Sequence, residues 1–301
     1  MKFDKIVRDI KILKIQSAEN IAKYSILALK DYASDIDTIT KTKFIDELDK
    51  AKTILFQTRA TEPCMRNALN FITHDLDASS LNKLQKKLDV RIKQALDHIE
   101  NAENTIAKIG ARKIKNNYKI FTHCHSSTVM AILKKAKQQN KNFEVHNTET
   151  RPKFQGRTTA LELTKESIPI VHYVDSAARL ALKKVDLMII GCDAIDSEGK
   201  CYNKIGSEMF AEIANKFDIP VYVATDSWKF DPKTIFGFNE EIEKRSSKEV
   251  WTNAPKKIKI ENYAFEKINP NLISGIISEI GIFKPQLFIE ELKSKYKFMF
   301  I

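Results

Sequence analysis

Glycine and proline are distributed very unevenly along this chain. The first glycine is Gly110, and Pro63 is the only proline in residues 1–109, whereas residues 110–301 contain all eight glycines and seven of the eight prolines. Because these two residue types mark tight turns, we expect few turns in the first part and many in the second. The chain is therefore predicted to form a helical N-terminal domain over residues 1–115 and a differently built domain over residues 116–301.

Apolar residues in the first part recur at helical spacing. The clearest pattern predicts one long helix from about residue 79 to 115, with Ser79 or Ser80 as its cap. Its apolar positions are Leu81, Leu84, Leu88, Ile92, Leu96, Ile99 and Ile106.

The second part alternates between short apolar segments and helix-like stretches of ten to fifteen residues. The expected strands are 118–122, 143–147, 168–174, 185–190 and 219–224. Apolar strands separated by helices indicate a parallel sheet that is covered on both faces. The expected fold class is α/β, a helical domain followed by a doubly wound, Rossmann-like parallel sheet. Such sheets bind ligands beyond the carboxyl ends of their strands.

The amino-acid composition excludes several classes of protein for this chain. With 43% hydrophobic and 30% charged residues, the 301-residue chain is globular. No apolar run reaches the ~20 residues of a membrane span, so no membrane partner is expected. The four cysteines, Cys64, Cys124, Cys192 and Cys201, have no Cys-x-x-Cys spacing, which favours a cytoplasmic protein with reduced thiols.

The net charge of +11 suggests an anionic partner. Basic residues are not interleaved with aromatic ones as in RNA-recognition modules, so nucleic acid is disfavoured as that partner. The chain also lacks Gly-x-Gly-x-x-Gly and P-loop motifs, which leaves dinucleotides and nucleoside triphosphates without support. The remaining interpretations of the charge are a phosphorylated metabolite as partner and no charged partner at all.

Two of the expected strand ends carry reactive side chains. Cys124 lies between a strand and a helix start, where the helix dipole would lower its pKa, although a lone cysteine is also commonly a buried core residue. His123 and His125 flank it, but alternation along a strand disfavours chelation of a metal by all three. Asp193 follows an apolar strand, where a raised pKa would suit a general acid; alternatively it is a turn residue.

Other polar residues at the strand ends have two interpretations. Ser126, Asp175 and Asn203 are each possible helix caps. Basic residues there are either solvated surface charges or groups that bind phosphate. The basic candidates are Arg59, Arg151, Arg157, Lys204 and Lys229.

Several motifs at these strand ends resemble those of one protein family. They are residues 123–126, 148–156, 174–179, 191–193 and 203–206. They resemble the family that contains archaeal ribose-1,5-bisphosphate isomerases, methylthioribose-1-phosphate isomerases and regulatory subunits of translation initiation factor 2B. The resemblance covers residues 5–300 and is most specific from about 118 to 250.

The resemblance implies roles for individual residues. Cys124 matches the catalytic cysteine and Asp193 the catalytic aspartate. The matching substrate-binding positions are Arg59, Ser126, Ser127, Gln155, Asn203, Lys204 and Lys229. Arg151, Gly156 and Arg157, from the same stretch as Gln155, complete the candidate set.

The activity implied by the resemblance is conversion of ribose 1,5-bisphosphate to ribulose 1,5-bisphosphate through an enol phosphate, in nucleotide (AMP) salvage. It implies no metal and no cofactor, AMP as an effector, and a homodimer or homohexamer. Because regulatory subunits have generally lost a catalytic residue and this chain keeps both, the enzyme is preferred over a non-catalytic regulator that binds a phosphorylated ligand and a protein partner. The chain departs from the isomerase pattern at Gln16, Ser17 and Glu62. The resemblance therefore does not determine the substrate.

Overall fold

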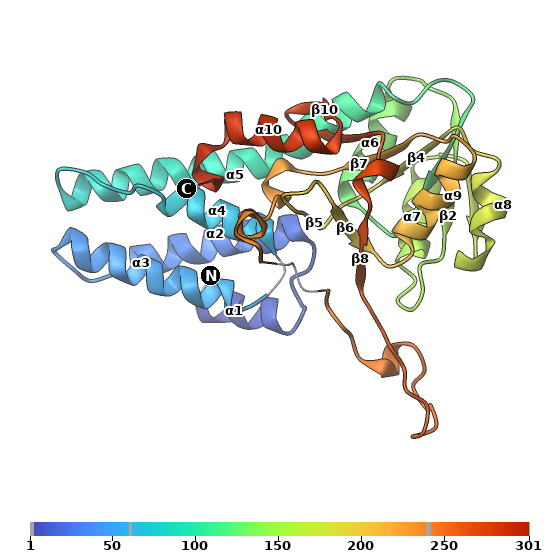
Figure 1. The fold of residues 1–301 in the computed structure, drawn as a ribbon. Helices are drawn as coiled ribbons and strands as arrows, with labels where there is room; N and C mark the ends of the chain where they lie inside the picture. The colour runs from blue at the N-terminus through green and yellow to red at the C-terminus, as the bar shows by residue number, and fades with distance from the viewer. Residues whose placement is uncertain (1–2, 60–61, 239–241, 301) are drawn as a thin grey trace.

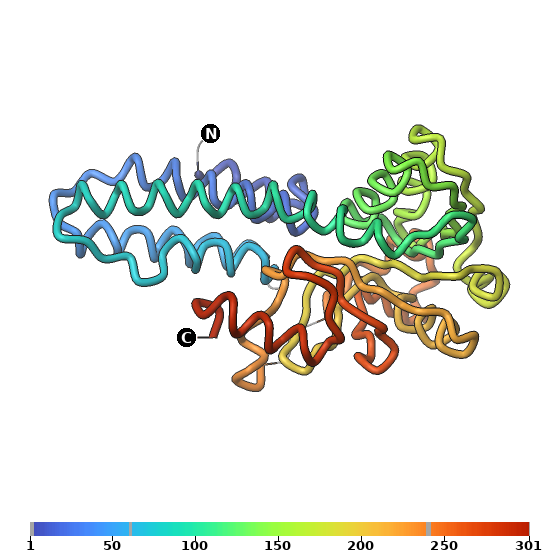
Figure 2. Tube along the Cα trace, turned by 90° about the horizontal axis from the view of Figure 1, so that it is seen from above, coloured from blue at the N-terminus to red at the C-terminus, as the bar shows by residue number. Residues whose placement is uncertain are grey.

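The structure is a computed structural model that describes residues 3–59, 62–238 and 242–300. An arm of helices extends from a part that contains the strands, so the molecule is elongated (Figures 1 and 2). The helices of the arm are α1 (Phe3–Lys11), α2 (Ala18–Ser34), α3 (Lys41–Phe56), α4 (Pro63–Thr73) and α5 (Leu81–Ala111).

The predicted long helix is confirmed as α5. It begins after Ser80, whose Oγ accepts a hydrogen bond from the backbone N of Lys83 at 3.4 Å. The helix runs from the tip of the arm to the strand-bearing part (Figure 2). Its buried positions, among them Leu84, Leu88 and Ile92, follow the expected spacing.

All five expected strands are present and parallel. They are β1 (Tyr118–Thr122), β2 (Phe143–Thr148), β3 (Ile170–Tyr173), β4 (Leu187–Ile190) and β7 (Val221–Ala224). The sheet order is β10-β9-β7-β4-β1-β2-β3. It is covered by α6 (Ser127–Gln138), α7 (Gln155–Lys165), α8 (Ala178–Leu182), α9 (Ser207–Lys216) and α10 (Pro285–Lys295). The expected doubly wound α/β fold is confirmed, and its strand order reverses between β1 and β4.

Five strands were not expected from the sequence. Strands β9 (Gly275–Ser278) and β10 (Gly281–Phe283) extend the main sheet beyond β7. A small antiparallel sheet contains β5 (Ala194–Ile195), β6 (Cys201–Lys204) and β8 (Phe265–Ile268). These segments are short and interrupted, so periodicity alone does not distinguish them from turns.

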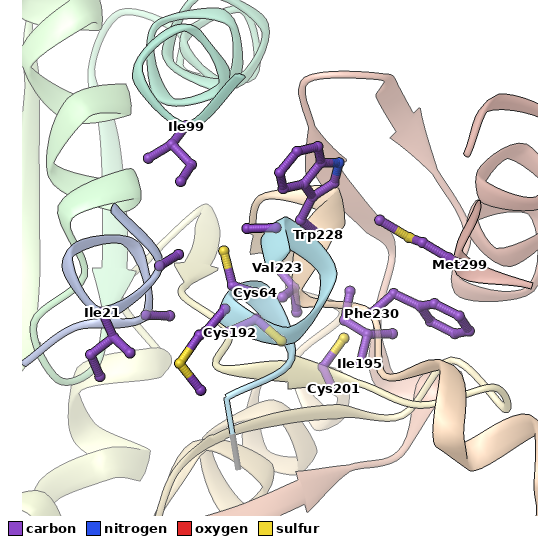
Figure 3. Close-up of a cluster of buried hydrophobic side chains, with 14 of the residues drawn as sticks. Ile21, Cys64, Ile99, Cys192, Ile195, Cys201, Val223, Trp228, Phe230 and Met299 are labelled. Atoms are coloured by element: carbon purple, nitrogen blue, oxygen red, sulfur yellow. The ribbon is translucent and has the colours of Figure 1, made fainter. Parts of the chain in front are cut away.

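One hydrophobic cluster joins the arm to the sheet. Ile21 and Ile99 of the arm lie in the same cluster as Val223, Trp228 and Phe230 (Figure 3). The boundary proposed at residues 115 and 116 falls in the connection between α5 and β1. Over the described ranges, no helix combines the length and the apolar character needed to cross a membrane.

All four cysteines lie among the described residues, and none is in a disulfide. Cys64, Cys192 and Cys201 are buried in this cluster (Figure 3), whereas Cys124 lies outside it. Cys64, Cys192 and Cys201 are therefore core residues, and Cys124 is the candidate catalytic cysteine.

Candidate active site

The two residues predicted to be catalytic follow neighbouring strands. Cys124 comes after β1 and Asp193 after β4, which pair in parallel with Ile120 opposite Leu187. This is the point at which the strand order reverses, where open α/β sheets bind their ligands.

A cleft of about 540 Å³ lies between the helical arm and the ends of these strands. Both parts of the chain supply its walls, so an arm residue such as Arg59 faces Asp193 across the same space. The lining residues are Ile12, Leu13, Gln16, Ser17, Ala18, Ile21, Arg59, Glu62, Lys153, Gln155, Asp193, Arg245, Glu249 and Phe265.

Cys124 has an unusual backbone conformation. Its φ is +67°, in the left-handed region that non-glycine residues seldom adopt. Two threonines hold it there: Thr150 Oγ1 accepts from the Cys124 N–H at 3.0 Å, and Thr159 Oγ1 donates to the Cys124 carbonyl at 2.9 Å. The strand end is therefore fixed by side chains from the next two segments of the fold.

The expectation that the Cys124 pKa is lowered was wrong. Burial raises the pKa of this thiol to about 11, and the nearby Lys204 ammonium offsets only part of that effect. Desolvation disfavours the thiolate more than a helix start favours it. Cys124 is therefore a thiol at neutral pH, and it lies beside the cleft rather than among the residues that line it.

Asp175 and Thr150 help to position Cys124, a role that sequence reasoning missed. The Asp175 carboxylate accepts hydrogen bonds from the backbone N–H groups of Thr150 at 2.9 Å and Arg151 at 2.7 Å. Thr150 in turn holds Cys124. Their only sequence signal was their presence in the family-like motifs, since a helix cap explained Asp175 equally well.

The raised pKa expected for Asp193 is confirmed. Burial raises it, against the opposing charges of Lys229, Lys204 and Arg59. Its backbone N–H donates to the Tyr202 carbonyl of β6 at 2.8 Å. A carboxyl group whose pKa is raised by burial suits proton donation and acceptance.

Two lysines face these residues from different elements. Lys229, at the end of the 3-10 turn Ser227–Lys229, donates to the Cys192 carbonyl at 2.7 Å. Its pKa is raised because Asp193 and neighbouring acidic groups outweigh the opposing effect of burial. Lys204 is buried in β6 with its ammonium 4.6 Å from the centroid of the Phe265 ring. Both lysines are placed to stabilise negative charge.

Asn203 and Gln155 have different environments. Asn203, considered a possible helix cap, instead lies within β6, and its Nδ2 donates to Ser207 Oγ at 3.0 Å. Gln155 lines the cleft, and its Oε1 is buried without a hydrogen-bond partner among the described residues. An unsatisfied buried acceptor at a cleft wall fits a ligand hydroxyl.

Gly156 has a packing role. A Cβ at this position would lie 1.7 Å from the Thr148 carbonyl oxygen, so only glycine allows α7 to begin so close to β2. The Gly156 carbonyl accepts from Asn147 Nδ2 at 2.7 Å.

Arg151 and Arg157 do not line the cleft. The Arg151 guanidinium donates to the Val250 carbonyl at 3.0 Å, and that of Arg157 contacts Glu149 at 3.3 Å. Both lie near the ring of Phe154. For these two side chains, the interpretation as surface charges describes the structure better than phosphate binding does.

The serines after Cys124 have separate positions. Ser126 caps α6, because its Oγ accepts from the Val129 N–H at 3.4 Å, as expected. Ser127 lines a second, small cavity of about 40 Å³ together with Lys229, Asp226 and Ser17. Ser17 lines both cavities and therefore lies between them.

The histidines beside Cys124 are occupied by other contacts. His123 Nε2 donates to the Ile205 carbonyl at 2.9 Å, which leaves Nδ1 to accept from Thr148 at 2.7 Å. Burial lowers the His123 pKa to about 4, so the ring is neutral. His125 contacts Thr159 at 3.0 Å. These partners hold the segment in place.

This fold occurs in a known family. The chain belongs to the initiation factor 2 subunit family, whose model matches residues 14–285. It is 35% identical to ribose 1,5-bisphosphate isomerase of Thermococcus kodakarensis, over 97% of this chain and 94% of that protein. It is 36% identical to ribose 1,5-bisphosphate isomerase of Methanocaldococcus jannaschii, over 92% and 90%.

A solved structure has the same fold over nearly the whole chain. It is the translation initiation factor eIF-2B of Pyrococcus horikoshii OT3, with a TM-score of 0.81 and 27% identity, covering 95% of this chain and 98% of that one. The family resemblance inferred from the strand-end motifs is therefore confirmed.

Proposed function

We propose that this chain is an aldose–ketose isomerase that converts ribose 1,5-bisphosphate to ribulose 1,5-bisphosphate in the cytoplasm, within AMP salvage. The observation that carries the proposal is the position of Cys124 and Asp193 at adjacent strand ends beside one cleft, with Arg59, Lys204 and Lys229 close enough to act on their charges. The names of the relatives at 35% and 36% identity support the same substrate and favour an enzyme over a non-catalytic regulator.

The first step opens the sugar ring. Protonated Asp193 donates its proton to the ring oxygen as the bond between C1 and that oxygen breaks, because the C1 phosphate prevents simple ring opening. The raised pKa of Asp193 keeps this proton available.

The next steps move protons between C2, O2 and C1. Cys124 reacts as the thiolate, which forms when the thiol proton passes to solvent, and this thiolate removes the C2 proton to give an enol phosphate with a C1–C2 double bond. Cys124 then returns a proton to C1 while the Asp193 carboxylate accepts the O2 proton, so the ketone forms and both residues regain their starting states. Lys204 favours the thiolate, and it acts with Arg59 and Lys229 to neutralise phosphate and developing charge. These steps require neither a metal ion nor an organic cofactor.

The remaining candidates have supporting roles. The substrate is bound by Gln155, Asn203, Ser126 and Ser127, either directly or through the loops that carry them. Gly156 allows Gln155 to approach the cleft. For Arg151 and Arg157, substrate contact requires that each side chain leave its present partner. We also propose a homodimer or homohexamer and AMP as effector, to be measured by light scattering and by assays with added AMP.

The decisive experiment follows isomerisation in D₂O. Because the Cys124 thiol exchanges with solvent between taking the C2 proton and returning a proton to C1, the proton-transfer route predicts solvent deuterium at C1 of ribulose 1,5-bisphosphate, whereas a hydride shift from C2 predicts none. Cys124→Ser should lower kcat by about 10²–10⁴-fold. Cys201→Ala, which changes a buried cysteine outside the cleft, should retain activity. Turnover of Cys124→Ser near that of the wild type, or a product free of deuterium, contradicts the assignment of Cys124 as base.

A further inference from the structure

Arg59 is held by two carboxylates at the cleft. Its guanidinium lies 3.3 Å from Glu62 Oε1 and 3.6 Å from Glu243 Oε2. Glu243 in turn contacts Arg245 Nε at 3.3 Å through its other oxygen. Arg59 and Glu62 belong to the arm, whereas Glu243 and Arg245 come from the segment that precedes β8, so the chain of charges crosses the cleft.

Glu62 is the most buried of these carboxylates. Only 7% of the residue is exposed, and it lies at the start of α4 beside the cleft. The charged groups that face it are Arg59, Asp193, Lys229 and Arg66. Burial raises the Glu62 pKa to about 7, which Arg59 opposes and Asp193 reinforces. Glu62 therefore exchanges a proton close to neutral pH.

An anion in this cleft competes with Glu62 for Arg59. Ionised Glu62 occupies the guanidinium and repels a phosphate oxygen, whereas protonated Glu62 does neither. A bound dianion also disfavours the ionised form of a neighbouring carboxylate, so binding draws a proton onto Glu62. Glu249, which pairs with Lys153 at 3.0 Å on the same cleft wall, does not contact Arg59 in this way.

We propose that Glu62 couples anion binding at Arg59 to the uptake of one proton. The guanidinium is released to the anion when Glu62 is protonated and is withheld when Glu62 is ionised. The inference rests on the proposed function in taking this cleft as the substrate site, but it concerns anion binding rather than the reaction.

The test measures sulfate binding by isothermal titration calorimetry at pH 6.0, 7.0, 8.0 and 8.5. Sulfate remains a dianion throughout this range, so pH dependence comes from the protein. The wild-type Kd should weaken above pH 7, approaching tenfold for each pH unit. Glu62→Gln should remove most of this dependence and bind sulfate more tightly than the wild type at pH 8.5. Glu249→Gln removes a carboxylate from the same wall and should keep the wild-type slope.

Equal slopes in the wild type and Glu62→Gln would overturn the inference, as would the absence of sulfate binding in both at pH 6.0. Circular dichroism of each variant excludes unfolding as the cause. The isomerase assay is read separately: pH-coupled sulfate binding without turnover of ribose 1,5-bisphosphate supports the inference and refutes the proposed function.

Discussion

His123 and Cys124, at the end of β1, are held in place by different contacts. His123 is neutral and bonded on both ring nitrogens, so it braces the strand end. Cys124 is held in a left-handed conformation by Thr150 and Thr159. The sequence places both at the strand end but does not show that the thiol is desolvated, because burial depends on residues far along the chain.

Glu62 makes folding stability depend on pH. Its pKa is 4.5 in an ordinary environment and about 7 in the fold, so the folded state binds the proton more tightly. Stability from this group is complete below pH 4.5 and is lost as the pH rises to about 7, by on the order of 3 kcal/mol in total. Glutamine does not titrate. Glu62→Gln should therefore gain stability relative to the wild type across this window and show a constant difference above it.

Urea unfolding of both proteins at pH 5, 6, 7 and 8.5 measures this difference. Glu249→Gln serves as the control with an unchanged pH profile. A stability difference between wild type and Glu62→Gln that is the same at all four values would contradict the buried, titrating role of Glu62.

At the scale of elements, the start of α7 is packed against the end of β2. Gly156 permits this contact, and the preceding residue, Gln155, reaches the cleft because of it. The same region carries Asp175, which accepts from the backbone of the turn after β2. The sequence indicated that these segments converge at one edge of the sheet, since parallel strands share their carboxyl ends. The sequence did not indicate that Asp175 holds the turn after β2 or that Gly156 allows α7 to pack against β2.

Gly156→Ala should be strongly destabilising. A Cβ 1.7 Å from the Thr148 carbonyl oxygen forces the backbone of α7 or β2 to move, at a cost of about 1–3 kcal/mol or more, and displaces Gln155. In Gly110→Ala the nearest atom is Cδ1 of Ile132 at 2.5 Å, the end of a flexible side chain. We expect the smaller loss there. Urea denaturation of the two variants ranks them, and the reverse order would contradict the packing role of Gly156.

At the scale of the molecule, the cleft exists because the arm is attached firmly to the sheet. Asn67 of α4 donates from Nδ2 to the carbonyls of Trp228 at 2.8 Å and Phe230 at 2.6 Å. Arg66 contacts Asp231 at 3.3 Å, and His98 contacts Asp226 at 3.1 Å. These buried contacts set the distance between Arg59 on the arm and Asp193 on the sheet.

Asn67→Ala should weaken this attachment. Two buried carbonyl acceptors lose their donor, at about 1–3 kcal/mol each. We expect a loss of stability of that order and a lower kcat/KM for the proposed isomerisation, because Arg59 is held less firmly. Asn104→Ala, which removes an exposed amide bonded to the Glu100 carbonyl, should change stability by less than about 0.5 kcal/mol. Urea denaturation and the isomerase assay provide the two readouts, and equal effects of the two substitutions would contradict the role of Asn67.

The sequence by itself determined the long helix α5, the five parallel strands from β1 to β7 and the grouping of Cys124 with Asp193. These follow from local periodicity and from the geometry of parallel sheets, both of which can be read along the chain. Only the tertiary structure decided that the Cys124 thiol is protonated, that Arg59 is held by Glu62 and Glu243, and that Arg151 and Arg157 have partners outside the cleft. The physical reason is that desolvation and ion pairing depend on residues distant in sequence.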